Sequence, residues 1–306
     1  MTHPPISDIS WIAVDWGTSR LRAWAMSADS SVLQFQSSDD GIRNLKSGAF
    51  EPALLSLINP WLGTDPIPVI ACGMVGSRQG WVEAPYKAVP CAPIAAEYVI
   101  AGSKSDKIRA FVLPGLMQSD PPDVMRGEET QVAGFLSQNS TYQGVLCMPG
   151  THTKWALIDG GKITEFHTFM TGDIFACLSE HSVLRHSINS DAWDPDVFLA
   201  ALDASVSRPE ALARSLFAIR SKYLLDGQEP GASRASLSGI LMGTELAAAK
   251  KFWLGNKVTL IGDPKLAGIY STALNYLGVQ SEIVDADRMT LNGLALAHSL
   301  VSKLES

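Results

Sequence analysis

The feature that most constrains this chain is a strand–turn–strand unit that occurs near the amino terminus and again near the middle. In each copy an apolar strand runs into a short polar turn and a second strand returns, over 11–14 and 21–26 in the first copy and over 145–148 and 153–158 in the second. When Gly17-Thr18 is laid on Gly150-Thr151, both turns contain small and hydroxyl residues, and both returning strands end in a further polar turn. This duplication predicts an α/β protein of two lobes with mixed sheets, whose two turns face each other across a cleft.

Length and composition agree with two lobes. The chain has 306 residues, 46% apolar and 18% charged, which excludes a disordered chain and suits two domains of about 150 residues each. We expect an amino-terminal lobe over 1–137 and a carboxy-terminal lobe over 138–306, with the last helix returning to the first lobe. Apolar periodicity predicts further helices over 50–61, 128–136, 197–202, 210–225, 236–253 and from 291, and further strands over 32–35, 68–72, 162–167, 258–261 and 282–284.

Charge and cysteine usage narrow the class of partner. The net charge is −7 and the chain contains no run of five or six basic residues that could bind a phosphate backbone, so nucleic acid is not expected as a partner. The four cysteines stand far apart, without zinc-ligand spacing, and are expected to be reduced thiols. No apolar stretch of about 18 residues and no signal-peptide pattern is present, so we expect a cytoplasmic protein that does not enter a membrane.

The first turn has the chemistry of a phosphate site. Neither a G-x-x-x-x-G-K-[ST] loop nor a G-x-G-x-x-G loop occurs in the chain. The run Asp15-Trp16-Gly17-Thr18-Ser19-Arg20 instead places a carboxylate at a strand end beside a bend with hydroxyls and free backbone amides. Such a bend suits a phosphate held beside Mg²⁺, which Asp15 could orient through water, because Mg²⁺ keeps several waters and takes few carboxylates. An ordinary hairpin turn is the alternative, and the second copy at Gly150 favours the phosphate site.

Several segments together resemble one family of sugar kinases. The two hairpins and a late strand that ends at Gly262 resemble the phosphate and adenosine elements of the actin, hexokinase and sugar-kinase superfamily, in the expected order. More narrowly, the chain resembles the 2-dehydro-3-deoxygalactonokinase family over nearly its whole length, most weakly between 186 and 235. The motifs that carry this resemblance are Val14-Asp15-Trp16-Gly17-Thr18-Ser19-Arg20, Gly73-Met74-Val75-Gly76-Ser77-Arg78-Gln79-Gly80-Trp81, Met125-Arg126-Gly127-Glu128-Glu129-Thr130-Gln131 and Pro149-Gly150-Thr151-His152-Thr153-Lys154-Trp155.

The resemblance implies that ATP, with Mg²⁺, phosphorylates 2-dehydro-3-deoxy-D-galactonate at its 6-hydroxyl in galactonate breakdown. The residues expected at the ATP phosphates are Gly17, Thr18, Ser19, Arg20, Gly150, Thr151, His152, Thr153 and Lys154, and those expected at adenosine are Gly239, Gly243 and Gly262. A strand-borne lysine such as Lys154 could equally face solvent. Helix packing explains Gly239 and Gly243 equally well. Beside Gly262, Asp263 is expected to cap a helix that begins at Pro264.

The sugar acid requires a group that binds its carboxylate. A planar guanidinium can hold a carboxylate through two parallel bonds, so Arg78, in the glycine-rich loop after the strand over 68–72, is the candidate. Gln79 and Trp81 are expected to line the same pocket. The alternative reading of Arg78 is an exposed loop charge in contact with water alone.

Catalysis requires a general base near the attacking hydroxyl. Glu128 lies before the second hairpin, at a position that resembles that of the catalytic aspartate in the wider superfamily. Asp173, which is also expected to contact substrate, and Asp123 are the alternatives. Glu128 and Glu129 could instead serve only to begin a helix, where carboxylates interact favourably with the dipole.

The expected partners are therefore ATP and a small sugar acid, and a homodimer is allowed. Two other functions stay open at this point. One is a kinase of another small keto acid or polyol, and the other is a non-catalytic, nucleotide-gated sugar-binding module. ATP consumption that depends on added sugar acid separates the enzyme from the module.

Overall fold

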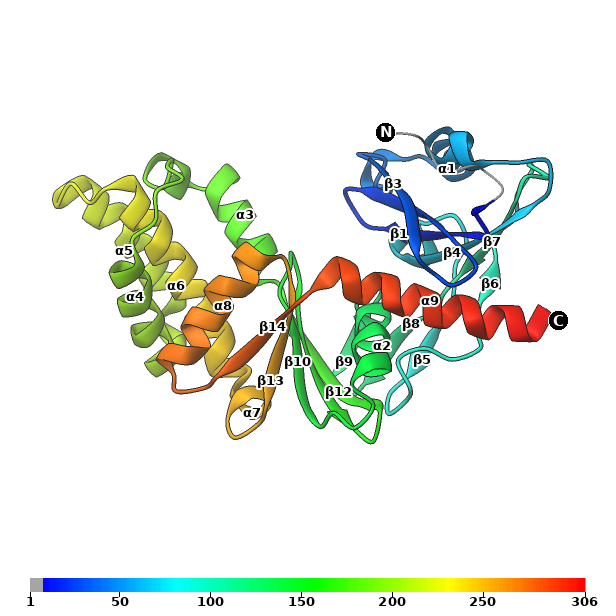
Figure 1. The fold of residues 1–306 in the computed structure, drawn as a ribbon. Coiled ribbons are helices and arrows are strands. Elements are labelled where there is room, and N and C mark those ends of the chain that lie inside the picture. The colour runs from blue at the N-terminus through cyan, green and yellow to red at the C-terminus, as the bar shows by residue number, and fades with distance from the viewer. Residues whose placement is uncertain (1–7, 306) are drawn as a thin grey trace. The chain divides into compact units, whose positions relative to one another are not determined.

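The structure, a computed structural model, describes residues 8–305 and confirms an α/β protein with mixed sheets (Figure 1). The described residues form two compact units. Unit 1 contains 8–142, Asp159–Glu165 and 286–305, and unit 2 contains Gln143–Ile158 and Phe166–Asp285. Within the described part of the chain, no helix has the length and apolarity needed to cross a membrane.

Unit 1 is built on a six-stranded sheet in the order β3-β2-β1-β4-β7-β6. The β1–β2 hairpin is antiparallel, and β1, β4 and β7 run parallel. A second, three-stranded sheet has the order β5-β8-β9. The strands are β1 (Trp11–Trp16), β2 (Leu21–Met26), β3 (Val32–Ser38), β4 (Ile67–Gly73), β5 (Tyr86–Ala88), β6 (Val99–Ile100), β7 (Ile108–Val112), β8 (Gly115–Ser119) and β9 (Pro122–Met125), and the α-helices are α1 (Phe50–Ile58), α2 (Glu128–Gln138) and α9 (Ala286–Glu305).

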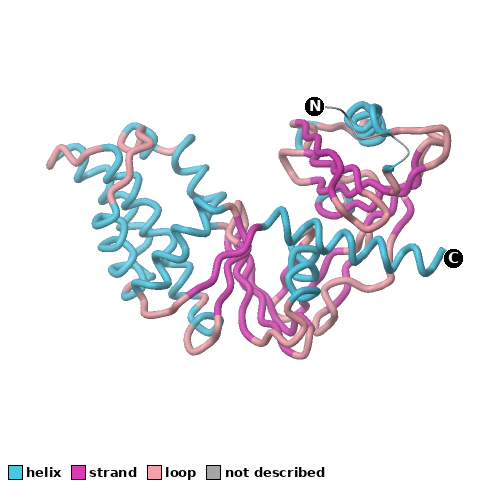
Figure 2. The backbone as a smooth tube through the Cα atoms, in the orientation of Figure 1, coloured by secondary structure: helices cyan, strands magenta, loops and turns pink. Residues whose placement is uncertain are grey.

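Unit 2 repeats the core arrangement of unit 1. Its five-stranded sheet has the order β12-β11-β10-β13-β14, with β10 and β11 antiparallel and β10, β13 and β14 parallel. The elements are β10 (Gly144–Met148), β11 (Thr153–Asp159), β12 (Lys162–Phe169), β13 (Val258–Gly262), β14 (Ser281–Asp285), α3 (Thr171–His181), α4 (Pro195–Ser207), α5 (Leu212–Leu225), α6 (Pro230–Ala248), α7 (Lys250–Trp253) and α8 (Pro264–Tyr276). The end of β11 and the first half of β12 fall in the segment Asp159–Glu165, which is assigned to unit 1. The segment between β12 and β13 is largely helical (Figure 2). The shared strand order confirms the duplication expected from the two hairpins.

Alternating burial in the central strands gives unit 1 a core on both faces of its sheet. Ile12, Val14 and Trp16 of β1 lie in the cluster that includes Phe50 of α1. The intervening residues, such as Trp11, lie in the opposite cluster with residues of α9. This alternation follows from the two-residue period of a strand, which sends successive side chains to opposite faces.

Two glycines allow α9 to pack closely against α2. A Cβ on Gly134 would lie 1.9 Å from the Met289 carbonyl oxygen, and one on Gly293 would lie 2.0 Å from that of Thr130. Any side chain at either position would therefore force the helices apart. Figure 1 shows the two helices side by side. This contact brings the carboxy-terminal helix onto the first unit and places its first turn near β1 and β2.

The structure differs from the sequence-based expectations in several places, among them α3, which was not expected, and α4, which is longer than the expected 197–202. The strands β5 to β9 were not expected, because they are short and several lie at the surface, where apolar alternation is weak. α6 begins at Pro230 rather than 236, with proline at its first position. α9 begins at Ala286 rather than 291, with the charged pair Asp287 and Arg288 in its first turn.

Candidate active site

The first predicted phosphate turn is held by backbone hydrogen bonds. The amide of Gly17 donates to the Arg20 carbonyl at 2.9 Å, which closes the turn between β1 and β2. The amide of Arg43 donates to the Thr18 carbonyl at 3.0 Å, so a following segment supports the turn from one side. Thr18, Ser19 and Arg20 are exposed. The turn therefore presents its hydroxyls to solvent on a fixed backbone.

Asp15 is bound by a residue that sequence reasoning missed. Arg22 lies directly opposite Asp15 in the hairpin register and donates to its Oδ2. The same guanidinium donates to Asp287 in the first turn of α9. Burial raises the pKa of the Asp15 carboxyl, and the nearby Arg22 charge opposes that rise. The pairing of 15 with 22 was available from the sequence, because both flank the turn symmetrically.

Two glycines with positive φ bring the start of α2 close to Asp15. Gly73 has φ +90°, and a Cβ there would lie 2.7 Å from the Trp16 carbonyl oxygen and 3.3 Å from Asp15 Oδ1. Gly127 has φ +110°, and its Cβ would lie 3.4 Å from the Gly73 Cα. Only glycine adopts these conformations without strain, so both motifs need it. The end of β4, the end of β1 and the first turn of α2 therefore converge.

The two adjacent glutamates of α2 point to different environments. Glu129 is 1% exposed, accepts from the Gly127 amide at 2.7 and 2.9 Å, and has its pKa raised to about 7, mainly by burial and then by the charge of Glu128. Glu128 is partly exposed, and its Oε2 accepts from the Arg126 amide at 3.1 Å. A substrate could therefore reach Glu128 but not Glu129.

We predict that Glu129 makes the free energy of unfolding of the protein fall as the pH rises. Its pKa is about 7 in the fold against 4.5 in the reference state, so between these values the native state holds the extra proton and stability falls with increasing pH. The full loss is about 3 kcal/mol, since each pKa unit corresponds to about 1.4 kcal/mol. Urea unfolding at pH 4.5 to 8 should show this loss in the difference between the unmodified protein and Glu129→Gln. A pH-independent difference would contradict the prediction.

The loop expected to bind the sugar acid follows β4 in unit 1. Arg78 and Gln79 are exposed at its tip. Trp81 is partly buried, packs edge-on against Trp16 at 6.4 Å between ring centroids, and donates to the Gly102 carbonyl at 3.2 Å. Trp81 thus anchors the loop beside the first hairpin, whereas the two polar side chains are available for a ligand.

A buried arginine that sequence reasoning did not assign lies beneath this loop. Arg126 is 8% exposed, donates from Nη2 to the Ala84 carbonyl at 2.8 Å, and lies 4.3 Å from the centroid of the Tyr86 ring. A Cβ on Gly76 would approach its Nη1 to 2.7 Å. Arg126 therefore joins the loop to the residues that precede Glu128.

The second predicted phosphate turn is supported by the first residues of α3. The Asp173 amide donates to the Thr151 carbonyl at 2.9 Å, and a Cβ on Gly172 would lie 2.4 Å from the Gly150 carbonyl oxygen. His152 Nε2 lies 3.7 Å from Asp173 Oδ2. Asp173 is thereby placed at the second turn, in unit 2, whereas Glu128 lies in unit 1.

The two residues that follow this turn are buried. Thr153 is fully buried and its hydroxyl lies 2.8 Å from that of Tyr270. Lys154 is 5% exposed, so the alternative of a solvent-facing lysine was wrong. The turn itself is left with Gly150, Thr151 and His152 at its accessible edge.

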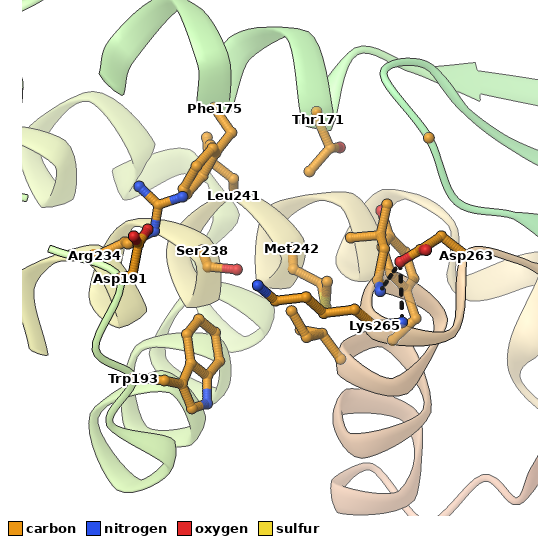
Figure 3. A pocket seen from close by; sticks show the side chains of 15 residues that line it. Thr171, Phe175, Asp191, Trp193, Arg234, Ser238, Leu241, Met242, Asp263 and Lys265 are labelled. Atoms are coloured by element: carbon orange, nitrogen blue, oxygen red, sulfur yellow. Dashed lines mark hydrogen bonds between the residues drawn. The ribbon is translucent and has the colours of Figure 1, made fainter. Parts of the chain in front are cut away.

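A cavity of about 470 Å³ opens beside the second turn, within unit 2. Apolar and aromatic side chains form most of its wall, and Figure 3 shows Lys265 extending into it while Asp263 caps α8. Asp263 Oδ1 accepts from the Lys265 and Leu266 amides at 3.0 and 3.2 Å, as expected for this helix start. The lining residues are Gly150, Thr171, Gly172, Phe175, Asp191, Trp193, Arg234, Ser238, Leu241, Met242, Asp263, Lys265, Leu266, Ile269 and Tyr270.

For Gly239 and Gly243 the structure favours helix packing, the alternative to the expected adenosine role. A Cβ on Gly239 would lie 2.4 Å from the Phe198 carbonyl oxygen, and one on Gly243 would lie 2.6 Å from that of Leu202. Both glycines therefore face α4 and serve helix packing, while Ser238, Leu241 and Met242 of the same helix line the cavity. Gly262 differs, because it lies beside the second turn, where a Cβ on it would be 3.4 Å from Pro149 Cδ.

No group of three or more His, Cys, Asp or Glu side chains suited to a metal ion occurs within residues 8–305. The donor expected at the first turn is the carboxylate of Asp15, whose Oδ2 is bound by Arg22. One carboxylate with water and phosphate oxygens is a usual environment for Mg²⁺. The residues present therefore fit a magnesium ion that arrives with a nucleotide.

Comparison with known proteins places this geometry in context. The family model described as 2-keto-3-deoxy-galactonokinase matches residues 15–297. A probable 2-dehydro-3-deoxygalactonokinase of Rhizobium meliloti is 36% identical over 94% of this chain and 96% of its own length. The 2-dehydro-3-deoxygalactonokinase of Escherichia coli is 32% identical over 95% and 99%. The crystal structure of a Sinorhizobium meliloti protein assigned the same name has a TM-score of 0.88 at 35% identity, covering 95% of this chain and 99% of that one.

Proposed function

Since the chain belongs to the 2-keto-3-deoxy-galactonokinase family, we propose that it transfers the terminal phosphoryl group of ATP to the 6-hydroxyl of 2-dehydro-3-deoxy-D-galactonate. The observation that carries the proposal is the cavity of unit 2, which has Gly150 of the second hairpin in its wall. A volume of about 470 Å³ lies within the usual range for small-molecule sites. Because the reaction consumes ATP, the cytoplasm is the compartment we propose.

ATP binds in this cavity with its adenosine among the apolar side chains and its phosphates toward the second turn. Trp193 offers an aromatic face to the base. Lys265 supplies a positive charge, and Gly150 allows close approach of a phosphate to the backbone. Asp15 would hold a Mg²⁺ ion bound with ATP, and the ion would neutralise charge on the transferring phosphoryl group.

The sugar acid binds to unit 1, where Arg78 holds its carboxylate and Gln79 and Trp81 line the site. The exposed position of Arg78 beside an anchored Trp81 supports this role. Glu128 accepts the proton of the 6-hydroxyl while the oxygen of that hydroxyl bonds to the γ-phosphorus. The bond from that phosphorus to the bridging oxygen of ADP breaks. The partial exposure of Glu128, next to the buried Glu129, supports the choice of base.

We predict that ADP release depends on the sugar acid and on its configuration. A coupled assay should give turnover with 2-dehydro-3-deoxy-D-galactonate and much slower turnover with the gluconate epimer, because the epimers differ where the pocket positions the chain of hydroxyls. ATP without sugar acid serves as the control. Equal ADP release with and without the acceptor would contradict the proposed function.

A further inference from the structure

A buried carboxylate lies behind the second turn and has no part in the proposed transfer. Glu245 of α6 is 3% exposed. Its Oε1 accepts from Trp155 Nε1 at 2.8 Å, and its Oε2 accepts from the Tyr270 hydroxyl at 2.8 Å and from the Thr171 hydroxyl. One side chain therefore joins β11, α3, α6 and α8.

The directions of these hydrogen bonds follow from the chemistry of the donors. An indole N–H can only donate, and an ionised carboxylate can only accept. With its proton directed to Glu245, the Tyr270 oxygen accepts from Thr153, whose hydroxyl lies 2.8 Å away. Burial raises the pKa of the Glu245 carboxyl, while the three donors favour its ionised form. The hydrogen bonds that run from Thr153, in the strand after the turn, through Tyr270 therefore all point in one direction, toward Glu245.

Both sides of the second turn depend on this network. On one side, Thr153 is the first residue of β11 and connects to Glu245 through Tyr270. On the other side, Thr171 begins α3, Gly172 lies too close to the Gly150 carbonyl oxygen for a Cβ to fit, and the Asp173 amide donates to the Thr151 carbonyl. Thr171 and Tyr270 also line the cavity.

We propose that Glu245 is a positioning residue that fixes the second turn in the conformation that binds the nucleotide phosphates. This inference rests on the proposed function, in which that turn contacts phosphate. Glu245 does not itself touch the nucleotide. It acts through Thr171, which holds the start of α3 against the turn, and through Tyr270, which holds Thr153.

The test compares nucleotides that share a base and differ in phosphate. Calorimetric titration of the full chain with Mg²⁺-ADP and with adenosine should show that Glu245→Gln weakens ADP binding about tenfold, since small displacements of a binding group have effects of at least this size, and leaves adenosine binding unchanged. Glu282→Gln, an exposed glutamate of β14, is the matched control. Unchanged ADP binding would overturn the inference, as would an equal loss for both ligands.

A second variant covers the case in which Glu245→Gln fails to fold. Tyr270→Phe keeps the ring and removes the hydroxyl that connects Glu245 to Thr153, while the bonds from Trp155 and Thr171 to Glu245 remain, so ADP binding should weaken selectively, by less than in Glu245→Gln. In the double variant the two losses should not add, because both break one network. Additive losses, or normal ADP binding in Tyr270→Phe, would refute the positioning role. If the unmodified protein bound neither ligand, that result would instead contradict the proposed function on which the inference rests.

Discussion

Replacing Glu128 with glutamine is expected to lower kcat by about a hundredfold to ten-thousandfold, with little change in either KM. General bases contribute factors of this size, and an amide cannot accept the hydroxyl proton. Glutamine keeps the shape of the side chain and its carbonyl oxygen, so the hydrogen bond from the Arg126 amide can persist. Steady-state kinetics with both substrates varied would measure kcat and the two KM values separately.

The controls for this prediction are the two alternative bases. Asp173→Asn alters a residue beside the second turn, and Asp123→Asn alters a residue of β9 whose Oδ1 accepts from the Val124 amide at 2.7 Å. Both should keep a kcat within a few fold of normal. Normal turnover in Glu128→Gln, together with a large loss in one of the other two, would transfer the role of base to that aspartate.

Replacing Arg78 with alanine is expected to raise the KM for the sugar acid by about a hundredfold and to leave the KM for ATP nearly unchanged. Two charge-assisted bonds to a carboxylate are lost, and a hundredfold change corresponds to roughly 3 kcal/mol. Arg78→Lys should recover part of the loss, because an ammonium supplies the charge without the planar pair of donors.

Arg109→Ala provides a matched control for Arg78. Arg109 is an exposed arginine of the same unit, on β7, and it pairs with Glu305 of α9. Its removal changes the net charge by the same amount and should leave both KM values unaltered. If Arg78→Ala raised both KM values equally, the loop would serve the enzyme in some way other than binding the sugar carboxylate.

The sequence predicted the parts of the site that lie on contiguous segments. The turn at Gly17, the helix that begins at Glu128 and the cap at Asp263 are set by neighbours within a few residues, so residue types and spacing reveal them. Arg22 could have been found in the same way, from its register opposite Asp15. That the two turns bind a triphosphate from opposite sides stays a prediction.

The sequence did not reveal which neighbouring element or cavity each residue of a helix contacts. Gly239 and Ser238 are neighbours on one helix, yet one packs against α4 and the other lines the cavity. Glu245 gave no sequence signal, because its three donors come from segments far apart in the chain.

By itself, then, the amino-acid order determined that two similar hairpins open two α/β units, since strand and turn formation depend on local periodicity and turn chemistry. Only the tertiary structure decided which carboxylates are buried and which reach solvent, as with Glu129 and Glu128. The reason is physical: burial depends on the elements that pack against a residue, and those elements are brought together only when the chain folds.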